Sequence, residues 1–238
     1  MLDTTMPHDD DPALDDPVGG SLAGRHARLA RRRGRAAAYL TDVATFSTVT
    51  VAPEARDWAD LAGLLGPGAF ADMFNCPALP PPGWESVFVL DGRQLIWHGD
   101  GRTPGPDTGV VELGAADVPE MLGLVAQTEP GPFRPRTHEL GTYLGVRVDG
   151  TLVAMAGERL RPPGWTEISA VCTAPDARGQ GHAARLVATL AARIVGRGER
   201  PFLHVAEHNT AAIALYERLG FTTRRKVTFR GFRTPGST

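Results

Sequence analysis

The fold of this chain is decided by the stretch Thr173-Ala174-Pro175-Asp176-Ala177-Arg178-Gly179-Gln180-Gly181-His182-Ala183. A strand-like segment, residues 167–172, leads into it, and an amphipathic helical pattern, residues 182–195, leaves it. A strand, a glycine-containing turn and a helix in that order gather free backbone N–H groups at the positive end of the helix dipole. The stretch therefore predicts a binding site for the phosphate groups of a ligand.

Two well-known phosphate-binding loops do not match this stretch. It lacks the Lys-Ser/Thr ending of an ATP-type P-loop, and it lacks the Gly-x-Gly-x-x-Gly pattern of a dinucleotide site. The remaining pattern, Arg178-x-x-Gly181-x-Ala183, is weak alone, because many glycine turns before helices are purely structural. The ligand must be identified from the residues downstream.

A second motif, Asn-Thr-Ala-Ala-Ile-Ala-Leu-Tyr-Glu-Arg-Leu-Gly-Phe, occupies residues 209–221. Together the two motifs resemble those of the GNAT superfamily of acyl-CoA-dependent N-acetyltransferases, over roughly residues 109–233. The resemblance implies an α/β (α+β) fold with a mixed central sheet, splayed middle strands and flanking helices, preceded by a smaller α/β N-terminal region. It implies an enzyme that moves the acetyl group of acetyl-CoA to a primary amine by direct attack, with no metal.

The resemblance also implies how acetyl-CoA is held. The backbone of residues 171–173 would pair with the pantetheine arm, and the amides of residues 179–184 would cradle the pyrophosphate. Most members carry Val where this chain has Thr173, a difference that should matter little for a backbone contact. The implied cofactor-binding residues are Val171, Cys172, Thr173, Arg178, Gly179, Gln180, Gly181, His182, Ala183, Ala184, Asn209 and Tyr216. For Asn209, a helix N-cap is an equally good interpretation, and both roles can hold together.

Three residues are the implied catalytic groups. Tyr216 matches the family's general acid, which protonates the departing CoA thiolate, although an aromatic on this helix could simply be core. Glu167 and His204 both occupy positions where family members place a general base. Either could instead be an ordinary polar residue on a strand, and proton shuttling through water stays open. Glu158 and Glu207 are weaker candidates.

Composition limits the other classes of function. The chain has 238 residues, a net charge of −2 and 42% hydrophobic residues, which are typical of a globular protein without a general attraction to nucleic acid or anionic membranes. No segment reaches the ~20 apolar residues needed to span a bilayer. Two cysteines, Cys76 and Cys172, form neither a disulfide framework nor a metal motif, so we expect a cytoplasmic protein.

Turn signals and charge divide the chain into five parts. We expect a disordered acidic tail (1–20), an N-terminal accessory region (21–98), a linker (99–108), the acetyltransferase domain (109–233) and a short tail (234–238). A hairpin is expected over residues 84–97, turning at Asp91-Gly92, as a second one turns at Asp149-Gly150. This echo suggests a degenerate half-copy of the domain, although unrelated accessory structure is the preferred interpretation.

Partners are less well defined. The basic stretch Arg25–Arg35 is expected to be a solvated helix face, with nucleic-acid contact as the weaker alternative. The resemblance implies an acceptor site at residues 132–139 and 226–232, where Arg134 and Arg136 could face an acidic acceptor or simply be solvated, but the acceptor amine is not identified. The first half could roof the cleft or form a homodimer surface. A non-catalytic acyl-CoA-binding or sensing module is the alternative function.

Overall fold

The computed structural model describes residues 10–74, 76, 78–99 and 109–236. Its helices, with η for short 3-10 turns, are η1 (Pro12–Leu14), α1 (Pro17–Ala23), η2 (Ala27–Leu29), α2 (Ala55–Leu65), η3 (Ala115–Asp117), α3 (Val118–Thr128), η4 (Thr137–Leu140), η5 (Pro175–Ala177), α4 (His182–Gly196) and α5 (Thr210–Arg218). Its strands are β1 (Ala30–Arg33), β2 (Ala36–Tyr39), β3 (Ser47–Thr48), β4 (Phe70–Met73), β5 (Glu85–Trp97), β6 (Val110–Leu113), β7 (Tyr143–Val148), β8 (Thr151–Glu158), β9 (Trp165–Thr173), β10 (Arg200–Ala206) and β11 (Phe221–Arg233).

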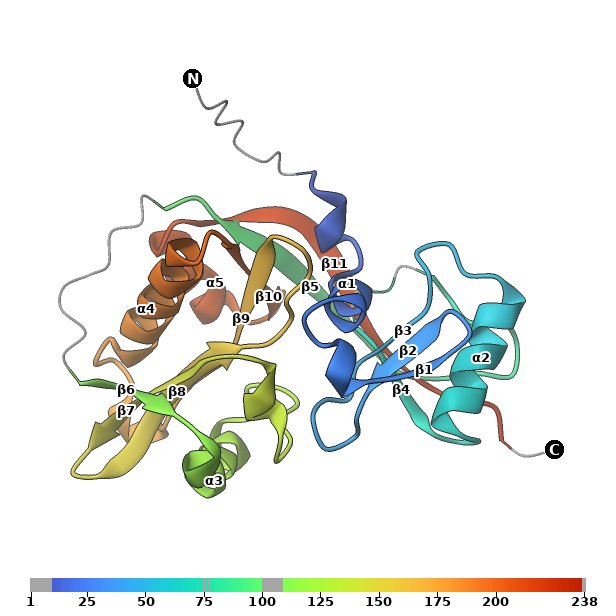
Figure 1. Ribbon diagram of the computed structural model, residues 1–238. Helices are drawn as coiled ribbons and strands as arrows, with labels where there is room; N and C mark the ends of the chain where they lie inside the picture. The colour runs from blue at the N-terminus through green and yellow to red at the C-terminus, as the bar shows by residue number, and fades with distance from the viewer. Residues whose placement is uncertain (1–9, 75, 77, 100–108, 237–238) are drawn as a thin grey trace.

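The main sheet has eight strands in the order β4-β11-β5-β10-β9-β8-β7-β6. Only β9 and β10 run parallel, while the other neighbours are antiparallel. Helix α4 packs Leu186 and Leu190 against Ile168 on one face of the sheet, and α3 packs Met121 against Cys172 in a separate cluster. The predicted α/β fold, a mixed sheet flanked by helices, is confirmed (Figure 1).

The first half of the chain is not a separate accessory layer, because β5 lies inside the main sheet between β10 and β11. Its residues Leu95 and Ile96 are fully buried. In Figure 1, the long strands β5 and β11 run together from the α4 side of the molecule to β4, beside the small β1-β2-β3 sheet and α2. The linker expected at residues 99–108 therefore does not separate two sheets. Of the expected linker, only Gly99 lies within the described residues.

The hairpin expected at Asp91-Gly92 is wrong, since β5 runs straight through both residues. At Gly92 there is no room for a side chain. A Cβ there would lie 2.4 Å from Cε2 of Phe229 and 2.7 Å from the carbonyl oxygen of Val205. The glycine thus permits an aromatic ring of β11 to lie over the strand. The half-copy hypothesis also fails, because β4 and β5 are separated by β11.

Residues 10–20 are ordered and packed, contrary to the expected acidic tail. Leu14 and Val18 are buried with Leu22 in a cluster against the main sheet. The aspartates cap helices instead of repelling one another: Asp11 accepts a hydrogen bond from the amide of Ala13, and Asp16 accepts one from Gly19. Residues 1–9 of that predicted tail lie outside the described residues.

The chain's C-terminal segment is anchored at its start. Thr234 is buried, its hydroxyl accepts a hydrogen bond from the amide of Ala69 at 2.8 Å, and it donates to the carbonyl of Gly66 at 2.6 Å. The tail expected from residue 234 therefore begins later than predicted, and residues 237–238 lie outside the described residues.

The basic stretch Arg25–Arg35 forms η2 and β1, not a solvated helix face. Its arginines find acceptors within the chain: Arg35 pairs with Asp57 at 2.7 Å, Arg31 donates to the carbonyl of Tyr39, and Arg32 to that of Leu22. These arginines thus connect segments of the N-terminal region through an ion pair and hydrogen bonds. In the part of the chain that the structure describes, no helix is long and apolar enough to cross a membrane.

Candidate active site

The central opening of the sheet lies between β9 and β10. These strands pair only near their starts, at Trp165–Arg200, Thr166–Pro201 and Glu167–Phe202. Beyond Glu167 they separate, so the β10 side of residues 168–173 carries no ladder partner from β10. An unpaired strand edge of this kind offers alternating N–H and C=O groups to an extended ligand. The predicted splay of the middle strands is therefore present.

A bulge deforms β9 inside this opening. The register with β8 shifts between the pairs Met155–Cys172 and Gly157–Ser169, and Ala170 has a φ of 52°. A left-handed conformation in a residue with a Cβ is unfavourable and is concentrated at functional sites. The bulge interrupts the alternation of side chains along β9, so that Ile168 and Val171, three residues apart, both belong to the α4 cluster, while Ala170 and Cys172 belong to the α3 cluster.

The predicted phosphate loop follows directly. Gly179 and Gly181 have φ values of 77° and 78°, which favour glycine, and Gly181 is the N-cap of α4. The first backbone hydrogen bond into this loop comes from the amide of Arg185. Among the described residues, the amides of residues 179–184 donate to no acceptor. These six N–H groups at the start of a fifteen-residue helix are free to donate to an anion.

Side chains of the loop have different surroundings. Arg178 is exposed, and its Nε donates to the carbonyl of Thr173 at 3.4 Å. The ring of His182 is buried, and neither of its nitrogens has a hydrogen-bond partner in the described part of the chain. Burial also raises the pKa of Cys172, whose thiol packs on the α3 side. Any contact of Cys172 with a ligand in the opening would therefore be made by its backbone.

Asn209 lies at the same end of the sheet as the phosphate loop, because β9 and β10 are parallel and each is followed by a helix. Its side chain accepts a hydrogen bond from the amide of Ala212 at 3.2 Å, so Asn209 is the N-cap of α5. The residue is exposed, which leaves its amide nitrogen available to a ligand.

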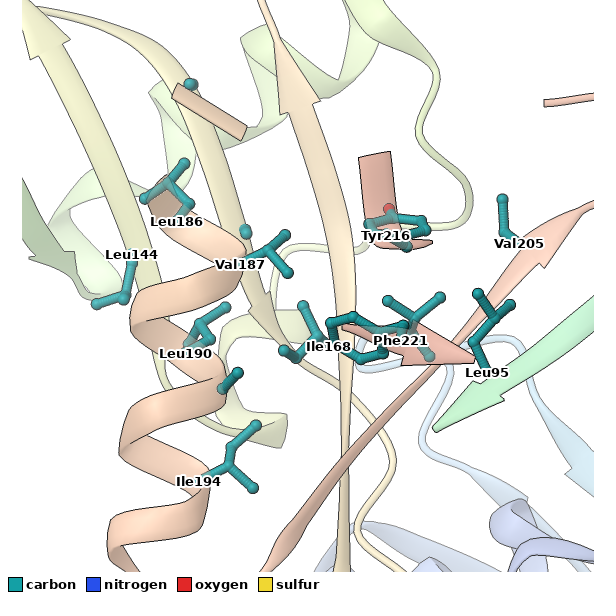
Figure 2. Packing of buried hydrophobic residues seen from close by; sticks show 14 of the residues in the cluster. Leu95, Leu144, Ile168, Leu186, Val187, Leu190, Ile194, Val205, Tyr216 and Phe221 are labelled. Atoms are coloured by element: carbon teal, nitrogen blue, oxygen red, sulfur yellow. The ribbon is translucent and has the colours of Figure 1, made fainter. Parts of the chain in front are cut away.

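Tyr216 on α5 has its ring in the apolar cluster under α4. The ring lies 6.0 Å from that of Phe221, and Figure 2 shows Phe221 beside Ile168, with Tyr216 above it between Val187 and Val205. No hydrogen bond links its hydroxyl to another described residue. Burial raises the pKa of Tyr216 to about 12, so the phenol stays protonated at neutral pH. A protonated, unpartnered phenol can donate to a nearby anion.

Glu167 lies at the point where β9 and β10 separate, but its side chain is fully buried and bonded. Its two oxygens accept hydrogen bonds from Arg159 at 2.6 and 2.7 Å, and Oε1 also accepts one from Nδ1 of His204 at 2.7 Å. Burial alone would raise the pKa of Glu167, but Arg159 and His204 outweigh it and lower the pKa to about 2. The arrangement does not favour Glu167 as the base.

His204 belongs to the same buried network. Its Nε2 lies 3.1 Å from the amide nitrogen of Gln94, which also donates to the carbonyl of Leu14. Burial lowers the pKa of His204, against the opposing effect of Glu167. A neutral ring that donates from Nδ1 and accepts at Nε2 satisfies both contacts. Both ring nitrogens of His204 therefore already have hydrogen-bond partners within the protein.

The two weaker base candidates are also paired. Glu158 is buried, with Oε1 2.7 Å from Nη2 of Arg197 and Oε2 accepting from the amide of Thr142. Glu207 forms a two-bond ion pair with Arg93. Among the described residues, no group of three His, Cys, Asp or Glu side chains is arranged to hold a metal ion.

Sequence reasoning missed Arg159, the residue at the centre of the buried network. Its guanidinium lies over the rings of Phe46 (5.0 Å) and Phe74 (4.7 Å) and is only 11% exposed. An arginine directly after a strand pattern looks like any solvated residue, and its partners come from distant parts of the chain. Only the folded arrangement reveals it.

Comparison with known proteins identifies the family. Residues 143–230 match the model of the FR47-like protein family. A curated relative, the N-alpha-acetyltransferase RimI of Mycobacterium tuberculosis, is 36% identical over 129 residues, which cover 48% of this chain and 80% of the relative. The chain belongs to the GNAT family. Its relatives are N-acetyltransferases, and the protein is accordingly an enzyme of that type.

Solved structures extend the similarity to the first half of the chain. A crystal structure described as a GNAT-family acetyltransferase, from Novosphingobium aromaticivorans, is 40% identical, with a TM-score of 0.86, and the match covers 96% of this chain and all of the other. A GCN5-related N-acetyltransferase from Kribbella flavida covers 94% of this chain and 96% of its own, with a TM-score of 0.61 and 18% identity, and so shares the fold. The fold of nearly the whole chain, N-terminal region included, is thus found in other proteins.

Proposed function

We propose that this GNAT enzyme transfers the acetyl group of acetyl-CoA to a primary amine. The opening between β9 and β10, which ends at the six unpartnered amides of residues 179–184, carries this proposal. A pantetheine arm would pair with the free edge of β9, and the pyrophosphate would meet the amides. The residues proposed to hold acetyl-CoA are those of β9, the phosphate loop and Asn209.

The proposed reaction is direct. The free amine attacks the thioester carbonyl and forms a C–N bond, and the carbonyl electrons move to an oxyanion held by a backbone N–H near the bulge of β9. The oxyanion then expels the CoA thiolate, breaking the C–S bond, and the thiolate takes a proton from Tyr216. The hydroxyl of Tyr216 is bonded to no other described residue, which supports that role. The nitrogen, which carries a positive charge after the attack, loses one proton to solvent, and the phenolate regains one, so the products are a neutral amide and the CoA thiol.

Removal of the amine's proton needs a separate step. Glu167 and His204 are both bonded within the buried network, so we propose that the ammonium loses its proton to water before attack. Glu167 and His204 would then act as positioning residues that fix Arg159 and the start of the opening. Because a protonated amine has no lone pair, the rate should follow the fraction of free amine as the pH rises.

Tyr216→Phe tests the proposed acid. Release of free CoA thiol should fall by about 10- to 100-fold in kcat, the range of general acid–base effects. Affinity for acetyl-CoA, measured by calorimetric titration, should remain nearly unchanged, since the ring is kept. Full activity in Tyr216→Phe would exclude this role. Binding of acetyl-CoA without thiol release by any amine would instead favour a sensing module.

The cellular location and the oligomeric state of the protein are also proposed. Cys76 and Cys172 are both free thiols, which supports the proposed cytoplasmic location. A homodimer through the first half stays a prediction.

A further inference from the structure

Gln94 of β5 connects the first half of the chain to the buried network around Glu167. It lies directly opposite His204 in the antiparallel pairing of β5 with β10, and it is 0% exposed. Its amide nitrogen lies 3.1 Å from Nε2 of His204 and donates to the carbonyl of Leu14 at 2.9 Å, and its amide oxygen accepts from Nη1 of Arg224 at 2.9 Å. A buried side chain with three such contacts is held in one orientation.

The orientation of this amide follows from its partners. A guanidinium can only donate, so the group that faces Arg224 is the amide oxygen. A carbonyl can only accept, so the group that faces Leu14 is the amide nitrogen. The same nitrogen faces Nε2 of His204, which must therefore accept and carry no proton. The proton of the neutral ring is left on Nδ1, which donates to Glu167 at 2.7 Å.

An irregularity in β11 places Arg224 for this contact. The register of β11 with β5 shifts between Thr223 and Arg225, so Arg224 is an extra residue on the bulged strand. A bulge of this kind redirects a side chain. Arg224 is only 6% exposed, and its Nη2 donates to Asp15 of the N-terminal segment at 2.9 Å. The residue that orients Gln94 is thus itself held in place.

Three aromatic rings enclose the imidazole of His204. The rings of Phe74, Phe202 and Phe229 have their centroids 4.8, 5.7 and 6.0 Å from that of the imidazole, and all three meet it edge to face. Close packing of this kind leaves the ring little freedom to rotate. Contacts at Nε2 therefore determine how Nδ1 is presented to Glu167.

Arg159 is the end of the network that meets the bulge of β9. It lines a pocket beside the bulge together with Ala170, and its guanidinium is bound by Glu167 through two hydrogen bonds. Glu167 is bound in turn by His204. Each contact in this series has a fixed donor and a fixed acceptor, so a change at one end affects the other end.

We propose that Gln94 is a positioning residue for the acetyl transfer, supplied by the first half of the chain. It fixes the proton of His204 on Nδ1, so that His204 and Arg159 together hold Glu167 at the point where β9 and β10 separate. The first half of the chain is then a part of the active site. The inference rests on the acetyl transfer proposed above.

The first test observes the ring directly, by nitrogen NMR of the full chain labelled at histidine. At neutral pH the proton of His204 should be on Nδ1, with the resonances assigned by their absence from His204→Phe. Gln94→Met keeps the length of the side chain but cannot donate, so the Nε2 resonance should shift. A proton on Nε2 in the wild type would overturn the proposal, and so would an unchanged Nε2 resonance in Gln94→Met.

The second test is a double-mutant cycle on the release of CoA thiol, with trialanine as the probe amine. Gln94→Met should lower kcat about ten-fold, as expected for one lost hydrogen bond, and leave KM for acetyl-CoA unchanged. In the His204→Phe background the same change should lower kcat by less than about two-fold, because Gln94 acts through His204. Equal losses in the two backgrounds would overturn the proposal.

Thr48→Val separates positioning from stability. Thr48 is another buried polar residue of the first half, 8% exposed, and its hydroxyl donates to Asp16 outside the network. The variant should lower the thermal midpoint, while kcat and the resonances of His204 stay at their wild-type values. A loss of kcat as large as that in Gln94→Met would show that general destabilisation slows the enzyme.

An unchanged kcat in Gln94→Met, with trialanine still acetylated, would overturn the positioning role and leave the acetyl transfer intact. Binding of acetyl-CoA with no acetylation of any amine would contradict the proposed reaction itself. The two failures are therefore distinguishable.

Discussion

Arg159 and Glu167 form a two-bond ion pair within the protein, with Nη2 2.6 Å from Oε1 and Nε 2.7 Å from Oε2. The Glu167 side chain is 0% exposed, and Oε1 also accepts a hydrogen bond from His204. A carboxylate bound by three donors is held in its charged form and is a weak base. Glu167 therefore fixes the position of Arg159 and is a poor acceptor for a proton from the substrate.

The pair predicts a large effect of Glu167→Gln on stability. Removing one partner leaves the buried charge of Arg159 uncompensated, which should lower the free energy of unfolding by about 3–5 kcal/mol. Urea denaturation monitored by tryptophan fluorescence would measure it. The double variant Arg159→Met/Glu167→Leu should recover most of the loss, since neither charge remains. Glu207→Gln, at the more exposed pair with Arg93, is the control and should leave stability nearly unchanged. A loss for Glu167→Gln as small as that of the control would contradict the interpretation.

The glycines of the phosphate loop allow a matched comparison. Gly181 and Gly198 have nearly the same left-handed φ, 78° and 75°, and a Cβ at either would meet no atom within 4 Å. Alanine at either position should therefore cost a similar ~1–2 kcal/mol of backbone strain. Only Gly181 caps α4 beside the free amides, so only Gly181→Ala should weaken acetyl-CoA binding, by about ten-fold or more, in calorimetric titration. Equal affinities for the two variants would argue against a phosphate site here.

Local patterns were sufficient for the elements around the proposed cofactor site. The helix expected over residues 182–195 matches α4, because its apolar period and the glycine before it are both encoded within a few residues. The Asn209 cap was predicted for the same reason. The spacing of Leu14, Val18 and Leu22 was also a helical signal, but the surrounding aspartates made the segment look unstructured.

Features that depend on distant contacts could not be predicted. Gly92 in β5 was interpreted as a turn residue because Asp-Gly is a strong turn signal. In the structure, a glycine is needed within the strand because the ring of Phe229, far along the chain, packs against this position. Likewise, Glu167 looked like a free base because Arg159 and His204 reach it only in the folded sheet. Pairing between distant strands, not local pattern, determines which carboxylates are free to act.

A buried histidine makes the stability of the fold depend on pH. His26 is 3% exposed, its Nε2 donates to the carbonyl of Leu140 at 2.9 Å, and its Nδ1 accepts from the hydroxyl of Tyr39. Burial lowers the pKa of His26 to about 4, although the contact with Leu140 opposes the shift. The unfolded chain should bind a proton at this histidine near pH 6.5.

The free energy of unfolding should therefore decrease at acidic pH because of His26. As the pH falls from about 6.5 toward 4, the unfolded state is protonated before the folded state, so the contribution present above pH 6.5 is lost. Between pH 7.5 and 5.0 the loss should be about 2 kcal/mol in the free energy of unfolding. His26→Gln keeps a side chain that can donate and accept but removes the titration. Urea denaturation should show the variant losing about 2 kcal/mol less than the wild type over that range, and identical pH dependence of the two proteins would refute the assignment to His26.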